Sequence, residues 1–235
     1  MKKPVKKETK NEVIVVSVGG SLIVPEEIEI NFLSALKDLI IRETKKGKRF
    51  IIITGGGKVA RQYQHAANLL GSSETDADWI GIASTRLNGE LVRSIFGKMA
   101  YDKVIDSVAA LPTKSKQPVV IACGISPKGS SDKAAVFFAK KAKAKKIINL
   151  SNIDYVYTAD PKLDPTATKI ERTTWKEFRK IIPKKWTPGM SAPFDPIASK
   201  EAESIGIEVA IINGKKLGEL DNYLAGKEFV GSLIK

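Results

Sequence analysis

Three runs of small residues each follow a buried, strand-like segment of the sequence: Gly19-Gly20-Ser21, Gly55-Gly56-Gly57 and residues 124–131. Glycine lets a backbone approach an anion closely. A helix that starts after such a run offers unpaired N–H groups and partial positive charge. In an open α/β sheet these runs meet at the carboxyl ends of the strands, where ligands bind. The three runs together predict phosphate binding.

The glycine runs match neither of two common nucleotide motifs. The sequence contains no G-x-x-x-x-G-K-[ST] and no G-x-G-x-x-G, so neither a P-loop nor a dinucleotide fold is supported. Arg61 lies one helical turn beyond Gly57, where a guanidinium can bind phosphate oxygens in bidentate fashion. Asp132 and Asp195 each stand where a helix is predicted to begin, a position at which an acid is also an ordinary helix cap.

Strand-like and helix-like segments alternate along the chain, which predicts an α/β fold with a largely parallel sheet. The predicted strands cover 13–18, 49–54, 118–123, 146–151 and 207–213. Helical spacing of apolar residues predicts helices over about 30–46, 58–70, 75–97 and 132–145. A loop or short hairpin is expected over 152–168 and a long proline-containing loop over 183–196.

The second half of the chain carries two helix-start signals. Thr174 and Glu177 have capping-box spacing. Asp195-Pro196 is typical of a cap followed by proline in the first turn. No linker separates independent domains, so we expect a basic tail over 1–12 and one domain over 13–235.

The composition excludes some classes of protein and leaves one open. A single cysteine, Cys123, rules out a disulfide-stapled domain, and no apolar run is long enough to span a membrane. The net charge of +13 invites a nucleic-acid interpretation, but no zinc spacing, aromatic RNA-binding signature or arginine-rich block accompanies it. An anionic small substrate would benefit equally from such a field. These features favour a cytoplasmic protein that does not bind a membrane and for which nucleic acid is not the main partner.

An ordered set of motifs resembles the amino-acid-kinase superfamily. The set comprises GGSL, GGGKVAR, DADWIGI, GSSDKAA and VYTADPKLDPTATKI, and it starts from about residue 13. Within that superfamily the chain is similar to the UMP kinases of archaeal type. The resemblance implies a three-layer sandwich with a largely parallel central sheet, the carbamate-kinase-like fold. It also implies a UMP-binding lobe over 13–145 and an ATP-binding lobe over 146–235.

The resemblance implies transfer of the γ-phosphate of ATP to UMP, giving UDP and ADP for pyrimidine nucleotide synthesis. It assigns ATP binding to Gly19, Gly20, Ser21, Gly57, Arg61, Ser151, Asn152, Tyr157 and Asp160. It assigns UMP binding to Gly56, Asp78, Ile125, Ser126, Pro127, Lys128, Gly129, Ser130 and Ser131, with Asp78 on the ribose. The implied catalytic residues are Ser21, Arg61, Asp132 and Asp195.

The same resemblance implies Mg²⁺ bound with ATP and held mainly by the phosphates, with no direct protein ligand assigned. It also implies a homohexamer built as a trimer of dimers. Phosphoryl transfer needs mostly positioning and charge neutralisation. No general base is required, because a phosphate monoester is already largely ionised near neutral pH.

Three positions depart from the pattern of the family. Ser17 stands where many superfamily members have a lysine in the first strand, which leaves Lys58 and Lys128 as candidate replacements. Ile125 stands in a loop that usually carries threonine, so recognition of uracil could be relaxed. Tyr155 replaces a common glycine beside the expected adenine site.

Three alternatives to a UMP kinase remain open at this point. One is another superfamily kinase whose acceptor is a carboxylate, carbamate or isopentenyl phosphate; Arg61 and Asp78 argue against it, because those acceptors have no ribose. A second is a nucleotide-binding or storage protein that keeps the fold without catalysis. The third is a nucleic-acid binder, motivated only by charge.

Overall fold

The computed structural model describes residues 11–112, 114–127, 129–185 and 192–235. Its main sheet has seven strands in the order β3-β2-β1-β4-β8-β9-β7. The strands are β1 (Val13–Val18), β2 (Arg49–Thr54), β3 (Val119–Ala122), β4 (Lys146–Ser151), β7 (Arg172–Thr173), β8 (Glu208–Asn213) and β9 (Ser232–Ile234). Within this sheet, as the structure describes it, strands β3, β2, β1, β4 and β8 run parallel, β9 pairs antiparallel with β8, and β7 pairs parallel with β9. A separate hairpin joins β5 (Val156–Tyr157) to β6 (Lys169–Ile170).

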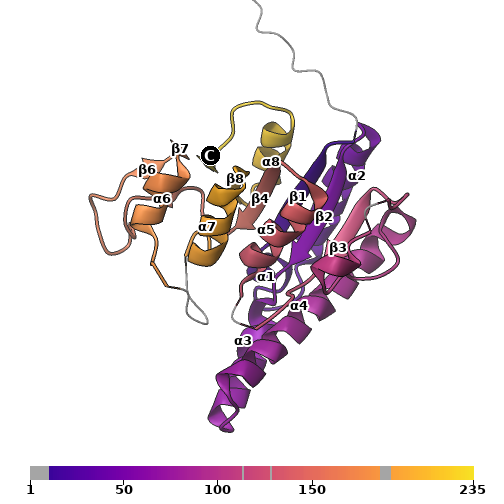
Figure 1. Ribbon diagram of the computed structural model, residues 1–235, viewed down its shortest axis with the longest axis horizontal. Coiled ribbons are helices and arrows are strands. Elements are labelled where there is room, and N and C mark those ends of the chain that lie inside the picture. Colours follow the sequence, from indigo (N-terminus) through magenta and orange to yellow (C-terminus); the bar gives the residue numbers. More distant parts are fainter. Residues whose placement is uncertain (1–10, 113, 128, 186–191) are drawn as a thin grey trace, which may run out of the picture.

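Helices cover both faces of the sheet, so the molecule has three layers (Figure 1). One face carries α2 (Ile30–Lys45), α4 (Glu74–Phe96) and α8 (Leu217–Leu224), and the other carries α5 (Ser131–Ala142), α6 (Trp175–Ile181) and α7 (Pro196–Ser204). The remaining helices are α1 (Gly20–Ile23), α3 (Gly57–Leu69) and the short 3₁₀ turns η1 (Gly97–Met99) and η2 (Val108–Ala110). The predicted α/β architecture with a largely parallel sheet is therefore confirmed.

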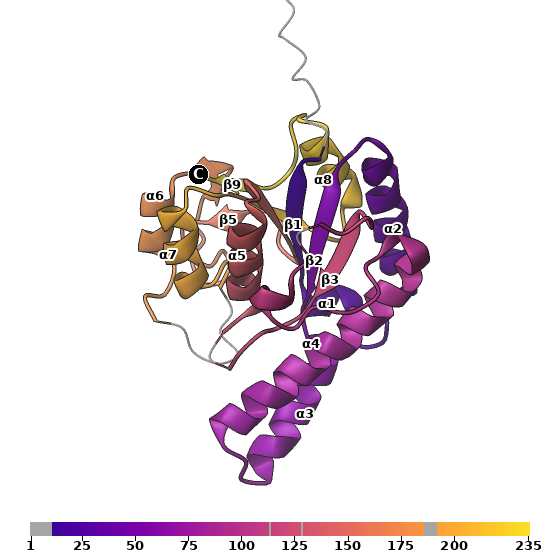
Figure 2. The ribbon, with the colours of Figure 1, turned by 45° about the vertical axis from the view of Figure 1, so that its right-hand side comes forward.

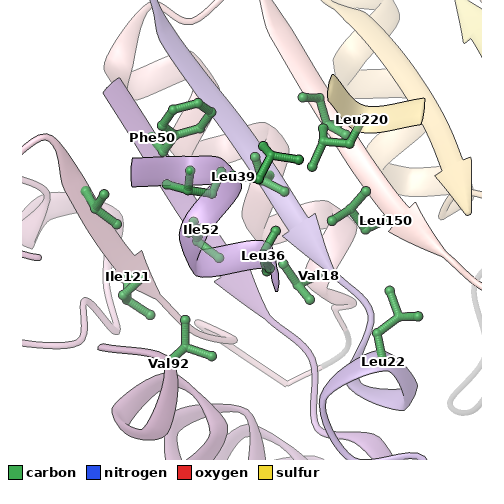
Figure 3. Packing of buried hydrophobic residues seen from close by; sticks show 14 of the residues in the cluster. Val18, Leu22, Leu36, Leu39, Phe50, Ile52, Val92, Ile121, Leu150 and Leu220 are labelled. Carbon is green, nitrogen blue, oxygen red and sulfur yellow. The ribbon is translucent and has the colours of Figure 1, made fainter. Parts of the chain in front are cut away.

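The central strands are buried on both faces, and their alternate residues feed two apolar clusters. Even-numbered residues of β1 and β2 face α2, α4 and α8, as Figure 3 shows for Val18, Phe50 and Ile52. Odd-numbered residues, such as Val15 and Ile51, face α5, α6 and α7. Parallel strands covered on both sides are expected to read as nearly continuous apolar runs. This explains why the strands were predictable from the sequence.

Helices α3 and α4 form an antiparallel hairpin that projects beyond the sheet at the carboxyl ends of β1 and β2 (Figure 2). Ser73 begins α4, since its hydroxyl accepts a hydrogen bond from the N–H of Asp76. Helix α3 begins in the glycine run after β2. Helix α4 then returns to the sheet and brings Thr85 to the loop after β3. Within the described residues, no helix is long and apolar enough to cross a membrane.

The structure differs from the sequence-based expectation in a few local details. The run Gly19-Gly20-Ser21 was expected to be a loop that leads into a helix, but Gly20 and Ser21 already belong to the helical turn Gly20–Ile23. Strand β7 was not predicted; two residues are too short to leave a pattern. The expected loop or hairpin over 152–168 is the β5–β6 hairpin, whose second strand lies just beyond that range. The sheet runs without a break through both predicted lobes, with β1 pairing directly to β4.

Candidate functional site

The first two glycine runs touch backbone to backbone at the carboxyl ends of β1 and β2. A Cβ placed on Gly20 would lie 2.0 Å from the nitrogen of Gly57, and one on Gly55 would lie 2.4 Å from the nitrogen of Gly20. Gly57 also has a φ of +67°, which residues with a side chain rarely adopt. No residue larger than glycine fits at Gly20 without moving the second run. The two predicted phosphate-binding runs therefore form one continuous surface.

Helix α4 ties this surface to the third run. The side-chain amide of Asn88 donates hydrogen bonds to the carbonyls of Gly55 (2.8 Å) and Gly56 (3.2 Å). One turn earlier, the hydroxyl of Thr85 accepts a hydrogen bond from the N–H of Gly124 at 2.9 Å. The hydroxyl of Thr54, at the end of β2, donates to the carbonyl of Thr85 at 2.8 Å. One face of α4 thus fixes both loops that flank it.

A cavity of about 520 Å³ opens between the α3–α4 hairpin and the loop after β3. Its lining includes most of the residues predicted to bind UMP: Gly56, Asp78, Ser126, Gly129, Ser130 and Ser131. The rest of the lining comes mainly from the facing sides of α3 and α4: Ala60, Gln64, Asn68, Glu74, Ala77, Gly81, Ile82 and Thr85, with Gly124 after β3. Residues from three distant parts of the sequence therefore meet at one cavity.

Two of the predicted UMP residues that the structure describes, Ile125 and Pro127, do not line this cavity. Ile125 lines a neighbouring hollow of about 390 Å³ with Trp79 and Cys123, and it packs against the apolar cluster under α5. Pro127 is partly buried in the same loop, and Lys128 lies outside the described residues. An apolar residue at position 125 is consistent with this placement, since it faces other apolar side chains. Whether Ile125 contacts a bound base remains a prediction.

The two acids predicted to be catalytic stand at the first turns of α5 and α7. Ser130 begins α5 by accepting a hydrogen bond from the N–H of Lys133 at 3.2 Å, as expected for a serine cap. Oδ1 of Asp195 caps α7 by accepting the N–H groups of Ile197 (2.6 Å) and Ala198 (2.8 Å). Both predicted helix starts are therefore confirmed.

Asp132 and Asp195 are also close to each other. Burial raises the pKa of the Asp132 carboxyl to about 7. The N–H of Asp195 opposes that rise, and the charge of the Asp195 carboxylate adds to it. Ionisation of Asp132 beside the Asp195 carboxylate is therefore costly unless a positive charge compensates it. The pair is thus a place where a positive charge would be stabilised.

The floor beneath this pair is polar, in the middle of an apolar sheet. Ser17 on β1 pairs in register with Asn149 on β4, and the amide of Asn149 donates to the carbonyl of Pro193. Two buried oxygens, Ser17 Oγ and Asp195 Oδ2, have no hydrogen-bond partner within the described parts of the chain. Buried polar atoms usually have partners, so these oxygens indicate a site completed by a ligand. No cluster of three or more His, Cys, Asp or Glu side chains suited to a metal occurs among the described residues.

The predicted ATP residues of the second half lie after β4 and on the β5–β6 hairpin. The carbonyl of Ser151 accepts the N–H of Gly214 at 2.8 Å, and Asn152 is exposed. Tyr157 is partly buried on β5, and Asp160 caps its own turn by accepting the N–H of Lys162 at 2.9 Å. Their contacts to a nucleotide stay predictions, because the hydrogen bonds seen here are structural ones.

Tyr155, the bulky replacement in this segment, has a local partner. The ammonium of Lys169 lies 4.9 Å from the centroid of its ring, an arrangement that cation–π attraction stabilises. The preceding Asp154 accepts hydrogen bonds from the Asn213 amide (2.8 Å) and the Lys216 ammonium (2.7 Å), which lower its pKa. The turn before the hairpin is therefore anchored to the end of β8.

Two basic residues near the glycine runs are placed differently from one another. Arg61 is exposed on α3 and is absent from the lining of the 520 Å³ cavity. Lys58, a candidate replacement for the missing lysine, forms an ion pair with Glu26. Ser21 lies on α1 and is partly buried.

Residues on the α3–α4 hairpin were missed by the sequence reasoning. Gln64 donates to the carbonyl of Ala77 at 2.9 Å, and a Cβ on Gly81 would lie 2.6 Å from the Gln64 amide nitrogen. Together with Thr85 and Asn88, Gly81 forms a small and polar stripe at helical spacing on α4. That stripe was the available signal, because a helix buried against a sheet normally presents apolar residues there.

Comparison with known proteins places these features in context. The model of the amino acid kinase family matches residues 12–213. A uridylate kinase of Methanospirillum hungatei is 32% identical over 223 residues, covering 94% of each chain. One from Archaeoglobus fulgidus is 33% identical over 224 residues, covering 94% of this chain and 99% of that relative.

Solved structures give the same picture. The crystal structure of uridylate kinase from Archaeoglobus fulgidus superposes with a TM-score of 0.81 at 32% identity, covering 94% of this chain and 99% of that one. A UMP kinase from Bacillus anthracis superposes with a TM-score of 0.77 at 19% identity, covering 97% of each chain, and at that identity it supports the fold alone.

Proposed function

The chain belongs to the amino acid kinase family, and on that premise we propose that it transfers the γ-phosphate of ATP to UMP, forming UDP and ADP. The observation that carries this proposal is the 520 Å³ cavity. Gly56 lines this cavity next to the surface formed by the first two glycine runs, and Asp78 lines it on the α3–α4 hairpin. UDP is a precursor of the other pyrimidine nucleotides, so this reaction serves their synthesis.

The acceptor would bind in the cavity in a single orientation. Its phosphate would bind at Gly56, and the ribose hydroxyls would donate hydrogen bonds to Asp78. The loop after β3 would close over the nucleoside with Ser126, Gly129, Ser130 and Ser131, all of which line the cavity. A carboxylate or carbamate would leave the Asp78 end of so long a site unused. Ile125, Pro127 and Lys128 belong to the same loop and stay part of the proposed acceptor site.

The donor would approach from the other side of the glycine surface. We assign its phosphates to Gly19, Gly20, Ser21 and Gly57, and its adenosine to Ser151, Asn152, Tyr157 and Asp160. The close contact between Gly20 and Gly57 supports this assignment, because it brings the two runs within the span of one transferring phosphate. Arg61 would reach the same point from α3, and its exposed position leaves the guanidinium free of helix packing.

Asp132 and Asp195 would organise the transfer centre. Their oxygens, with the Ser17 hydroxyl, are hard donors of the kind that Mg²⁺ prefers, and Asp195 Oδ2 is buried without a partner in the described structure. The residues therefore fit a Mg²⁺ that is held mainly by the ATP phosphates and contacted by this pair directly or through water. Bound there, Mg²⁺ would supply neutralisation of charge on the phosphates.

The remaining steps depend on positioning by this chain. The glycine amides would hold the two phosphates in line, and Arg61 would stabilise charge on the oxygens of the transferring group. No side chain needs to remove a proton, because the UMP phosphate is already ionised. We further propose that residues 13–145 act as the acceptor lobe and 146–235 as the donor lobe, in a cytoplasmic homohexamer built as a trimer of dimers.

An ADP-release assay with Mg-ATP tests the choice of acceptor. The panel would contain UMP, CMP, dUMP, AMP and GMP, with acetylglutamate, carbamate and isopentenyl phosphate as acceptors of other family members. We expect turnover with UMP and much weaker turnover with the purine nucleotides. Turnover with one of the non-nucleotide acceptors alone would contradict the proposal. Tight ATP or UMP binding without turnover would indicate a binding or storage protein.

A further inference from the structure

Asn88 is a buried polar residue that the proposed chemistry does not use. It lies on α4 with 4% of its surface exposed, and it is not part of the cavity lining. Its side-chain amide donates to two consecutive carbonyls of the second glycine run, those of Gly55 and Gly56. A side chain that binds two successive carbonyls of a glycine run helps to fix how both peptide planes are turned, although the Gly56 carbonyl also accepts the N–H of Ala60 at 3.4 Å.

Peptide geometry makes this control relevant to phosphate binding. In a planar trans peptide the C=O of one residue and the N–H of the next point in opposite directions. Because Asn88 holds the carbonyls of Gly55 and Gly56 toward α4, the N–H groups of Gly56 and Gly57 point away from α4. A Cβ on Gly20 would lie 2.7 Å from the Gly56 nitrogen and 2.0 Å from the Gly57 nitrogen. The two amides therefore face the junction of the two glycine runs.

We propose that Asn88 is a positioning residue for phosphoryl transfer, which turns the amides of Gly56 and Gly57 toward the phosphates. This inference rests on the proposed function, since it assumes that phosphates pass through that junction. Donors fixed before the substrate binds need no reorganisation when charge develops, which is where preorganised sites gain most of their effect. Three consecutive glycines cannot supply such order themselves, because glycine has the largest backbone freedom.

The residue type fits this task. A neutral amide offers two N–H donors, whereas aspartate of the same shape offers none when ionised. The helix also lies close enough for a short side chain to reach, since a Cβ on the adjacent Gly89 would stand 3.2 Å from the Thr54 hydroxyl. A longer amide would not fit this spacing, and a charged side chain would be costly to bury.

The test compares Asn88→Leu, which keeps the volume but removes the donors, with Asn88→Ser, which is smaller and keeps one donor. Ser84 on the same helix donates to the carbonyl of Ile80, so a serine is tolerated in this setting. The matched control is Phe178→Leu, a fully buried change in the apolar cluster on the opposite face of the sheet. For each variant we would measure kcat, KM, Tm and the equilibrium affinities for UMP and uridine.

We expect Asn88→Leu to lower kcat by about 100-fold, since loss of one preorganised donor has effects of this order. Its affinity for UMP should fall about tenfold while its affinity for uridine stays the same, because only UMP carries the phosphate. Asn88→Ser should change both quantities in the same direction by less. Phe178→Leu should lower Tm comparably and leave kcat and the ratio of UMP to uridine affinity within twofold.

Two results would overturn the inference. One is a kcat within twofold of the parent protein in both Asn88 variants. The other is an equal loss of affinity for UMP and uridine, which would indicate a general loosening of α4. If the parent protein fails to phosphorylate UMP, the proposed function fails instead. The ratio of UMP to uridine affinity then still tests the role of Asn88. A ratio that is lower in the Asn88 variants than in the parent supports that role, and an unchanged ratio contradicts it.

Discussion

The main-chain N–H of Asp195 donates a hydrogen bond of 3.1 Å to Oδ2 of Asp132. This bond joins the first turns of α7 and α5 above the polar pair Ser17 and Asn149. It also holds two carboxyl groups close together in a poorly solvated place. The relationship has consequences for stability and for catalysis that can be measured separately.

Stability without nucleotides should depend on the ionisation of Asp132. Its pKa is raised to about 7 in the folded protein, against about 3.9 in an unfolded chain. A carboxyl whose folded pKa is raised destabilises the fold once it must ionise, so this cost is absent below pH 4 and complete above pH 7. Asp132→Asn removes the ionisation. The Tm of Asp132→Asn relative to the parent protein should therefore increase between pH 4 and pH 8.

Asp38→Asn, an exposed change on α2, controls for replacing a carboxylate by an amide. Thermal unfolding across this pH range would be followed for all three proteins. A difference between Asp132→Asn and the parent that stays constant with pH would show that Asp132 is not strained by burial. Asp132→Asn should at the same time lose most of its turnover, if the pair organises the transfer centre.

The contact between the two glycine runs predicts a large effect of one added methyl group. In Gly20→Ala the new Cβ would meet the nitrogen of Gly57, so the runs must separate and kcat should fall at least about 100-fold. Gly218→Ala is the control, since no atom lies within 4 Å of its Cβ and alanine favours a helix by about 0.5–1 kcal/mol. Kinetics and thermal unfolding of both variants would decide. A normal kcat in Gly20→Ala would mean that the runs do not need their present spacing.

Asp78 should affect one substrate more than the other. Because Asp78 lines the cavity proposed for UMP, Asp78→Ala should raise KM for UMP by about tenfold, the loss expected for one hydrogen bond to a charged group. KM for ATP should change by less than twofold. Asp76→Ala, an exposed acid two residues earlier on α4, should leave both values unchanged. Equal increases for ATP and UMP in Asp78→Ala would place Asp78 outside the acceptor site.

Arg61 should matter for rate and not for stability. Its side chain is exposed, so Arg61→Ala should change the free energy of unfolding by no more than about 0.5 kcal/mol. Loss of a guanidinium at the transfer point should lower kcat by about 100-fold or more. Arg42→Ala, which removes an exposed arginine paired with Asp221 at 2.7 Å, is the matched control. An Arg61→Ala variant with near-normal kcat would remove Arg61 from the site.

The sheet was predictable because its strands are buried on both sides, and runs such as RFIIIT at 49–54 have few alternatives. The helix starts at Ser130, Thr174 and Asp195 were predictable for a similar reason, because each cap is a local arrangement within three residues. Such features depend on near neighbours in the sequence. These local features therefore form with little dependence on tertiary contacts to distant parts of the chain.

The site was only partly predictable because its assembly is not local. The resemblance supplied candidates such as Asp78 and Ser131, and the fold brings them to one cavity. The resemblance did not supply Asn88, and its place in the polar stripe of α4 could not identify its partners Gly55 and Gly56, which are more than thirty residues away. The placement of Ile125 in the hollow that Trp79 also lines likewise depends on tertiary packing.

The most direct test of the account follows the phosphate itself. ATP labelled at the γ-phosphate would be incubated with the protein, Mg²⁺ and UMP, and the products would be separated by chromatography. We predict that the label appears in UDP, one UDP forming for each ADP, and that Asp78→Ala slows this transfer at low UMP concentration. Label found only in inorganic phosphate, or retained entirely in ATP, would contradict the assignment of the chain as a UMP phosphotransferase.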